Sequence, residues 1–374
     1  MILESAKLLN FRCYESVELF FDSRFNTIIG KNGQGKTSIL EAIYLLSTLK
    51  SFRLARNPEL IRNHGDAAAI IGVTSHEGLK NTLQVRINQR LKHSTINGKS
   101  CKLLSEYMGK LSAVTFSPSD LEIIRGVPEF RRTWVDRIAT IFDPQHIDFC
   151  SRYTKVLNHR NKELKKLAQG QIYQLPDDFE VWTAELVRLG AQVIHNRIGA
   201  VDKLRPAMNQ FYRLISGTDD FLDVQYASDA FEGFDAGQQR AFSLDLLSQF
   251  LTKELNQLAA RERAYGSTLV GPHRDDLKMM FNGNLLKAYG SQGEVRSTVL
   301  AMRLAEVQSH REVSGIDPLL LIDDFSSELD SQRREFLLNY LCNIQSQIFL
   351  STTEDLTMGK VFNVHAGKVT VNGN

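Results

Sequence analysis

Residues 25–37 read FNTIIGKNGQGKT, and this stretch decides the fold. Its first five residues, Phe25–Ile29, are typical of a buried strand, and residues 30–37 fit the pattern G-x-x-x-x-G-K-[ST] at every position. The apolar run SILEAIYLL follows, so the motif stands between a strand and a helix, as a phosphate-binding loop does. The alternative is a glycine-rich turn with an exposed lysine, and the flanking sequence disfavours it.

Each part of the loop has an expected role at a nucleotide phosphate. Glycines let backbone N–H groups surround the β-phosphate, next to the positive N-terminal end of the following helix. We expect Lys36 to reach the β and γ oxygens, to face solvent in the absence of nucleotide, and to contribute little to packing. We expect the Thr37 hydroxyl to bind Mg²⁺. The residues expected to hold the nucleotide are Gly30, Lys31, Asn32, Gly33, Gln34, Gly35, Lys36 and Thr37.

An acidic partner for this loop lies in PLLLIDDFSSELD, residues 318–330. A carboxylate at the end of a buried strand can hold Mg²⁺, and a neighbouring one can orient the attacking water. We therefore predict that Asp323 serves the metal and that Asp324 acts in catalysis together with Lys36. The alternative is that both carboxylates only cap the end of a strand. No N-K-x-D guanine signature is present, because Asn161-Lys162 is followed by Glu163-Leu164, so the sequence predicts ATP with Mg²⁺.

A third motif, YGSQGE at 289–294, directly precedes the apolar helix pattern VRSTVLAMRLAEV. Ser291 and Glu294 have the spacing of a helix capping box, which is the plainer interpretation. The motif also lies about 30 residues before the acidic strand, as the signature of ABC ATPases does. In those enzymes the signature meets ATP held by the opposite subunit, so we expect Ser291 and Gly293 to contact nucleotide in trans.

The remaining pattern indicates an α/β protein. Residues 1–116 contain strand-like runs, with Asn97-Gly98 as a hairpin turn, and three stripes of apolar residues at helical spacing lie between about 145 and 263. Within the latter region we expect FLDVQYASDAFEGFDAG, residues 221–237, to be a loop or a weakly ordered connection instead of a helix, and after it we expect a strand at TLVG, residues 268–271. The four cysteines are far apart, and neither a signal peptide nor a membrane span is evident, so we expect a cytoplasmic protein.

Charge is unevenly distributed along a chain whose net charge is only +2. Residues 84–110 hold six Lys and Arg residues against one acid, whereas residues 219–235 hold six acids and no base. We expect strand alternation to place cations of the basic stretch on one solvent face, where they contact DNA phosphates. The alternatives are a merely solvated hairpin and a basic helix with Arg152, Lys155, Arg160, Lys162, Lys165 and Lys166. The three candidates for DNA contact are Arg90, Lys92 and Lys99.

Several blocks in this order resemble the RecF family. They are LLNFRCYESVEL, the phosphate loop with LEAIYLL, KSFR, FSPSDLEIIRGVPEFRRTWVD, GPHRDDL, YGSQGEVRS and LLLIDDFSSELD. The resemblance implies an ABC-type head, residues 1–140 and 264–374, with an inserted helical lobe at 141–263. It also implies ATP-dependent homodimerisation, binding to duplex DNA or duplex/single-strand junctions, and cooperation with RecR and RecO in loading RecA during repair and the SOS response.

Three departures from ordinary ABC enzymes bear on turnover. The water-orienting position is aspartate instead of glutamate, Thr352 or Thr353 stands where a switch histidine is usual, and no Gln loop is evident around FSPSD. A shorter acid suggests a slow, DNA-linked ATPase in which ATP times the dimer.

Other readings stay open at this point. GPHRDDL, residues 271–277, is interpreted as a local charge cluster, and Arg12 and Arg53 either reach nucleotide or form ordinary ion pairs. A transporter ATP subunit and a DNA clamp with vestigial ATP binding are the rival functions. The long interval from Lys36 to Ser291 disfavours the transporter.

Overall fold

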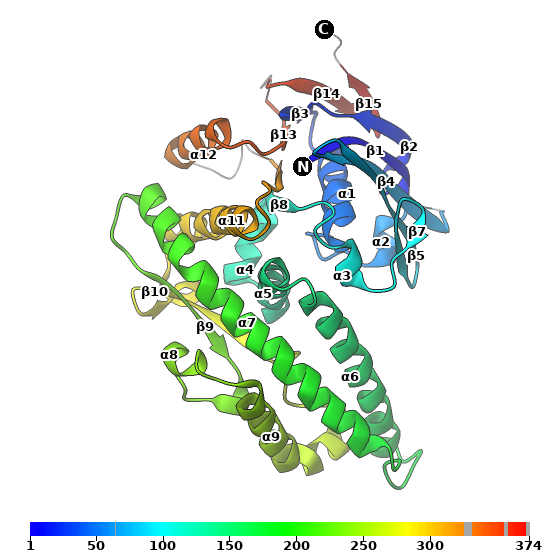
Figure 1. Ribbon diagram of the computed structural model, residues 1–374, viewed down its shortest axis with the longest axis vertical. Helices are drawn as coiled ribbons and strands as arrows, with labels where there is room; N and C mark the ends of the chain where they lie inside the picture. Colours follow the sequence, from blue (N-terminus) through cyan, green and yellow to red (C-terminus); the bar gives the residue numbers. More distant parts are fainter. Residues whose placement is uncertain (64, 325–330, 355–357, 372–374) are drawn as a thin grey trace. The chain divides into compact units, whose positions relative to one another are not determined.

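The computed structural model describes residues 1–63, 65–324, 331–354 and 358–371 (Figure 1). The chain divides into two compact units: residues 1–121, 211–217 and 296–374 form the first, and residues 122–210 and 218–295 form the second. These limits differ from the expected boundaries at 140 and 264. The helix that precedes residue 143 belongs to the second unit, because it packs against other helices and a strand of that unit.

The first unit contains an antiparallel sheet in the order β2-β1-β4-β5-β6-β7. Asn97 and Gly98 both have positive φ in the turn between its last two strands, as predicted for the hairpin. The strands are β1 (Ile2–Phe11), β2 (Tyr14–Phe20), β4 (Ala67–His76), β5 (Leu79–Asn88), β6 (Lys92–Ile96) and β7 (Lys99–Ser100).

The second sheet of this unit has the order β15-β14-β3-β13-β12-β8 and is parallel except for the pairing of β14 with β15. The strands predicted at 25–29 and 319–322 are present, and β13 lies between them. The carboxyl ends of these strands therefore meet at one edge. Its strands are β3 (Phe25–Ile29), β8 (Ala113–Phe116), β12 (Leu319–Ile322), β13 (Ile348–Thr352), β14 (Lys360–His365) and β15 (Lys368–Val371).

Helix α1 (Lys36–Thr48) packs against strands of both sheets. Its apolar residues, such as Ile39, Leu40 and Ile43, are fully buried, and so is Glu41. Since burial surrounds the helix, the unit has its main apolar core here. The unit's other helical segments are α2 (Asn57–Leu60), α3 (Leu104–Tyr107), η1 (Pro118–Leu121), α11 (Gln292–Ser314, within this unit from Arg296) and α12 (Ser331–Asn343).

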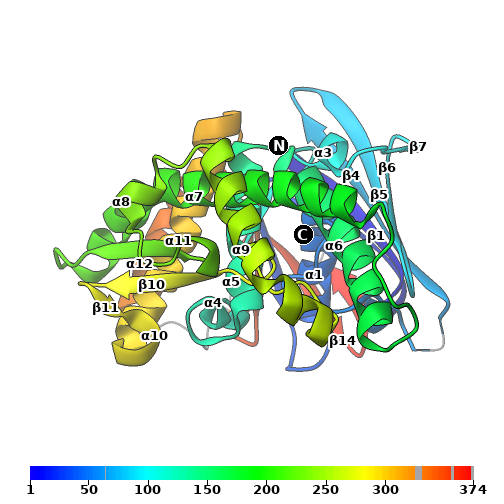
Figure 2. The same cartoon turned by 90° about the horizontal axis from the view of Figure 1, so that it is seen from below.

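The second unit combines helices with a short antiparallel sheet in the order β11-β10-β9, which Figure 2 shows next to α10. All three predicted apolar stripes are helices: α6 (His146–Ala168), α7 (Phe179–Ser216, of which residues 211–216 belong to the first unit) and α9 (Leu244–Tyr265). The remaining elements are α4 (Glu122–Arg125), α5 (Pro128–Phe142), β9 (Leu222–Ala227), η2 (Asp229–Phe231), α8 (Ala236–Gln239), β10 (Asp276–Phe281), β11 (Asn284–Leu285) and α10 (Leu286–Tyr289).

Two secondary-structure expectations for this unit are wrong. The segment expected to be a loop contains β9, in which Leu222, Val224 and Tyr226 alternate into the interior. The strand expected at 268–271 does not form, and side chains accept from the backbone N–H groups of its first two residues. Thr268 N–H donates to Asn161 Oδ1 at 2.8 Å, and Leu269 N–H donates to Glu262 Oε1 at 2.8 Å.

Across the described residues, no helix is both long enough and apolar enough to span a membrane.

Candidate nucleotide-binding site

The phosphate loop joins β3 to α1, as the motif predicts. Gly35 has a φ of 114°, and a Cβ there would lie 2.7 Å from Cys13 Sγ and 2.8 Å from the Tyr14 hydroxyl oxygen. That hydroxyl donates to the Gly35 carbonyl at 3.0 Å. Both the backbone conformation and the lack of space therefore require glycine at this position.

The turn between β14 and β15 holds the middle of the loop. Ala366 N–H donates to Gln34 Oε1 at 2.6 Å, and Gly367 N–H approaches the Gln34 carbonyl at 3.3 Å. A segment close to the C-terminus thus positions the loop before nucleotide binds.

Lys36 does not face solvent, contrary to the sequence expectation. It is 7% exposed, and its Nζ donates to the carbonyls of Gly30 at 2.6 Å and Lys31 at 3.1 Å. Burial lowers the pKa of Lys36, while Asp324 and Asp323 act in the opposite direction. The ammonium group is therefore folded over the loop at the start of a helix buried between two sheets.

Thr37 and Asp323 come together as the motifs predict. The Thr37 hydroxyl donates to Asp323 Oδ1 at 2.9 Å, and Asp323 N–H donates to the Phe116 carbonyl at 2.8 Å. Burial raises the pKa of Asp323, whereas hydrogen bonds from Ser351 and Thr37 and the charge of Arg53 lower it. Two oxygen ligands of the kind that Mg²⁺ prefers thus lie side by side next to the phosphate loop.

Ser351 is a site residue that sequence reasoning missed. It stands on β13, between the two motif strands, and its hydroxyl donates to Asp323 Oδ1 at 2.7 Å. Ser351 Oγ also accepts from Asp324 N–H at 3.0 Å. Asp324 follows with a φ of 53°, a left-handed backbone that turns the chain sharply after the strand. The signal in the sequence was the polar run that ends this strand.

The two threonines at the switch position differ in environment. Thr352 is buried, and its hydroxyl oxygen accepts from Glu354 N–H at 3.0 Å, whereas Thr353 is exposed. The FSSELD part of the acidic motif, residues 325–330, lies outside the described residues.

The FSPSD stretch borders the acidic pair. A cavity of about 60 Å³ is lined by Ser117, Asp120, Asp323 and Asp324 among others. Ser117 N–H donates to Asp120 Oδ2 at 2.9 Å, and Asp120 forms a buried ion pair with Arg303. This stretch, in which no Gln loop is evident, is therefore fixed beside the catalytic candidates.

Ser291 caps helix α11 in the second unit. Its N–H donates to Glu294 Oε2 at 2.7 Å, and its Oγ accepts from Glu294 N–H at 3.2 Å, so the plainer capping-box interpretation holds geometrically. Ser291 is also exposed. The contact of Ser291 and Gly293 with nucleotide in trans stays a prediction.

The DNA candidates differ in their exposure to solvent. Arg90 and Lys99 are exposed, but Lys92 pairs with the buried Ile87 across β5 and β6 and donates to the Leu49 carbonyl at 3.0 Å. Burial lowers the pKa of Lys92. On the alternative helix α6, Arg160 is buried against Glu262, whereas Lys155, Lys162 and Lys165 are exposed.

Two other charged groups are structural. Arg12 makes a two-pronged ion pair with the buried Glu41, at 2.8 and 2.7 Å, which is the ion-pair role expected from the sequence as the alternative to nucleotide contact.

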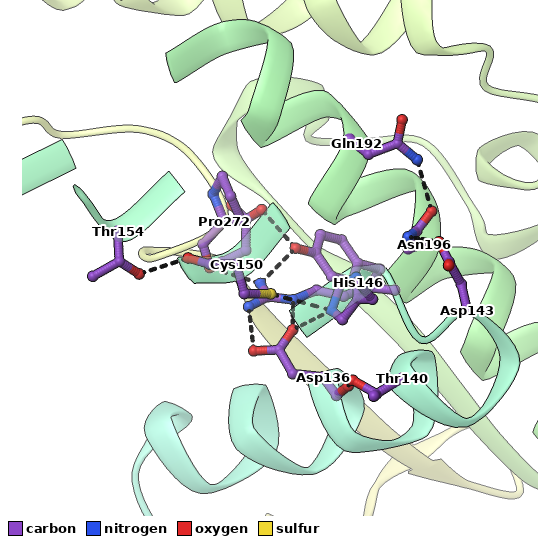
Figure 3. A network of polar contacts seen from close by, with 12 residues as sticks. Asp136, Thr140, Asp143, His146, Cys150, Thr154, Gln192, Asn196 and Pro272 are labelled. Atoms are coloured by element: carbon purple, nitrogen blue, oxygen red, sulfur yellow. Dashed lines mark hydrogen bonds and ion pairs between the residues drawn. The ribbon is translucent and has the colours of Figure 1, made fainter. Parts of the chain in front are cut away.

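In the second unit Asp136, His146 and Cys150 converge in the manner of metal ligands (Figure 3). Arg197, however, binds both Asp136 oxygens, at 2.7 and 3.0 Å, so this carboxylate is already neutralised.

Comparison with known proteins gives matches along almost the whole chain. The family model for the RecF/RecN/SMC N-terminal domain matches residues 2–372. The DNA replication and repair protein RecF of Geotalea uraniireducens is 35% identical over 376 residues, covering 99% of this chain and 100% of the relative. RecF of Exiguobacterium sp. is 34% identical, covering 99% of each chain.

Solved structures agree. The RecF–ATPrS structure of the recombination mediator RecF has a TM-score of 0.87 at 31% identity, covering 99% of this chain and 98% of that one. The RecF–ATP structure has a TM-score of 0.85 at 30% identity, with the same coverage. An Smc head domain from Pyrococcus furiosus, at 16% identity and a TM-score of 0.51, covering 99% of this chain and 95% of that one, shares the fold.

A phosphate loop, an acidic strand and an α/β head of this kind define an ABC-type P-loop ATPase. The chain belongs to the RecF family of DNA replication and repair proteins. Because the chain belongs to this family, the alternative of a transporter ATP subunit is excluded. ATP binding is a property of the family.

The loop geometry predicts unequal effects for two glycine substitutions. Gly33→Ala places a Cβ in open space at a φ of 78° and should cost about 1–2 kcal/mol of stability. Gly35→Ala adds overlap with Cys13 and Tyr14, for a further ~1–3 kcal/mol, and should displace the start of α1. Urea unfolding and titration with a fluorescent ATP analogue measure both. Equal stability and equal ATP affinity of the two variants would contradict this packing.

Proposed function

We propose that this chain is a slow, Mg²⁺-dependent ATPase that dimerises on DNA when ATP is bound. The expected DNA is a duplex or a duplex/single-strand junction, and the expected outcome is RecA loading with RecR and RecO in repair and the SOS response. The observation that supports ATP hydrolysis most directly is the hydrogen-bonded group of Thr37, Asp323 and Ser351 beside the buried Lys36.

Binding follows from groups that are already in position. Backbone N–H groups of residues 30–37 surround the β-phosphate, and the Lys36 ammonium exchanges its two carbonyl partners for phosphate oxygens. Thr37 and Asp323 would hold Mg²⁺, which neutralises phosphate charge when bound. Ser351 keeps the Asp323 carboxylate directed at Thr37.

Hydrolysis is assigned to Asp324. Its backbone is fixed by Ser351, and its carboxylate orients the attacking water. An aspartate is one methylene shorter than the usual glutamate, so water is held less closely and turnover is slow. The lifetime of bound ATP then sets the lifetime of the dimer.

Dimerisation is assigned to the start of α11 at Ser291 and Gly293, where Ser291 is exposed and the positive end of the helix would meet a γ-phosphate on a second copy. DNA contact in the first unit is assigned to Arg90 and Lys99. Lys92 is left out of this set because its Nζ already donates to the Leu49 carbonyl.

Asp324→Asn should retain ATP and Mg²⁺ but lower hydrolysis by about 100-fold or more, because water activation is lost. Phosphate release and equilibrium ATP binding measure the two properties separately. Asp323→Asn is the matched variant and should instead weaken Mg²⁺-dependent binding. If Asp324→Asn is the variant that fails to bind nucleotide, the two roles are exchanged.

Ser291→Arg should abolish ATP-dependent dimerisation while ATP still binds, because bulk and positive charge stand where the partner's nucleotide docks. Ser243→Arg is the control, since Ser243 is also an exposed N-cap serine in the second unit and accepts from Leu246 N–H. Sedimentation velocity with Mg²⁺ and ATP distinguishes them. A normal dimer from Ser291→Arg would contradict the composite site.

Arg90→Ala combined with Lys99→Ala should weaken DNA binding and reduce the dependence of affinity on salt, because fewer counterions are released. Lys92→Ala is the control and should leave that salt dependence unchanged, since its Nζ donates to Leu49. Fluorescence anisotropy of a gapped duplex over a salt series measures both. An unchanged double variant would move the contact away from this hairpin.

A further inference from the structure

The GPHRDDL block in the second unit separates its acids from its arginine. Asp275 is buried and accepts from the Tyr226 hydroxyl at 2.8 Å, and Asp276 forms a two-pronged ion pair with Arg131 at 2.6 and 2.9 Å. Arg274 instead is exposed. The block is therefore more than a cluster of mutually neutralising charges.

Hydrogen bonds from two other side chains of the second unit hold the GPHRDDL block in place. Arg197 Nη1 donates to the Pro272 carbonyl at 2.7 Å, and the Tyr153 hydroxyl donates to His273 Nδ1 at 2.7 Å (Figure 3 shows Pro272 in this network). Gly271 has a φ of 124°, and a Cβ there would lie 2.6 Å from the Tyr153 oxygen. The conformation that presents Arg274 is thus fixed by packing that requires glycine.

An open pocket of about 450 Å³ lies against this block, lined by Arg132, Asn161, Ser267, Thr268, His273 and Arg274. Arg132 Nη1 donates to the Asp275 carbonyl at 2.9 Å, and Arg274 has one long contact of 3.5 Å to the Thr268 carbonyl. Among the described residues, neither guanidinium has a carboxylate partner. By contrast, the nearby Arg131 and Arg160 are paired with Asp276 and Glu262.

The other lining groups add donors. Asn161 Oδ1 accepts from both the N–H and the hydroxyl of Thr268, which leaves its amide NH₂ as the group it can offer to a ligand. His273 uses Nε2 toward the Thr268 carbonyl, at 3.3 Å, and burial lowers its pKa to about 4, so it is neutral at pH 7. The charge of the pocket lining therefore comes from two arginines, without an acid in the lining.

Two cations without a bonded carboxylate and an excess of donors fit an oxyanion. Burial and the neighbouring Arg197 lower the pKa of Arg132, the charges of Asp276 and Glu129 act in the opposite direction, and a bound anion would add to the latter effect. Guanidinium groups match phosphate in geometry as well as in charge. The pocket is open at the surface, as contact with the backbone of a long polymer requires.

We propose that this pocket binds a backbone phosphate of DNA through Arg274, Arg132 and Asn161. The assignment rests on the proposed DNA binding and adds a second contact region, in a different unit from Arg90 and Lys99. Contacts of this kind fix position on the duplex without reading sequence.

The test is the salt dependence of DNA affinity of the full chain in the presence of ATP and Mg²⁺. Arg274→Gln should weaken binding and lower the log–log salt slope by about one, because one phosphate contact is lost. Adding Arg132→Gln should lower it further. Lys253→Gln is the control: it removes the same charge from an exposed position on α9, outside the pocket, and should change neither quantity. Arg274 is exposed and makes few contacts, so its substitution leaves folding intact, which thermal unfolding checks.

The outcomes separate this assignment from the proposed function. If the wild-type chain binds DNA and Arg274→Gln leaves the slope unchanged, the pocket assignment is overturned and the function stands. If inorganic phosphate binds at Arg274, as followed by phosphorus NMR, while that slope is unchanged, the pocket serves free phosphate and the DNA assignment is likewise overturned. If the wild-type chain does not bind DNA, both fail.

Discussion

The burial of α1 between two sheets is the constraint on which the nucleotide site depends. The helix begins at Lys36, directly after a glycine that no other residue can replace without overlap. Because both sheets contact the helix, its N-terminus cannot shift without disturbing the core of the first unit. The phosphate loop is thus preorganised by packing, and the β14–β15 turn adds hydrogen bonds at Gln34.

The positions of Asp323 and Asp324 likewise depend on the packing of the sheet that contains β12 and β13. β13 lies between the loop strand and the acidic strand, so a side chain at its carboxyl end can reach toward both. Ser351 occupies that position and links Asp323 to the backbone of Asp324. Substituting it would disturb the Asp323 carboxylate and the Asp324 backbone together, which explains why a neutral serine matters at a site described mainly by charged groups.

The parts predictable from sequence were those with local signals. The phosphate motif, the apolar strand before Asp323 and the three helical stripes carry their pattern within a few turns of chain, and the structure contains all of them. β9 was missed although Leu222, Val224 and Tyr226 alternate, because the acids and glycines around it obscured the period.

The predictions that were wrong concern residues whose environment depends on distant parts of the chain. Lys36 is buried because two sheets enclose its helix, and Lys92 faces inward because of its register with Ile87. Neither the enclosure nor the register can be recognised from the local sequence. The backbone N–H groups of Thr268 and Leu269 donate to side chains of α6 and α9 instead of to a neighbouring strand. Ser351 belongs to the same class, since its role exists only once three strands are side by side.

The central claim is that ATP held at this site drives two copies together. Sedimentation velocity of the wild-type chain, with and without Mg²⁺ and ATP and with nucleotide absorbance followed in the same run, tests it most directly. The account predicts a monomer without nucleotide and a dimer that carries ATP. A monomer that carries ATP at saturating nucleotide and Mg²⁺ would contradict it.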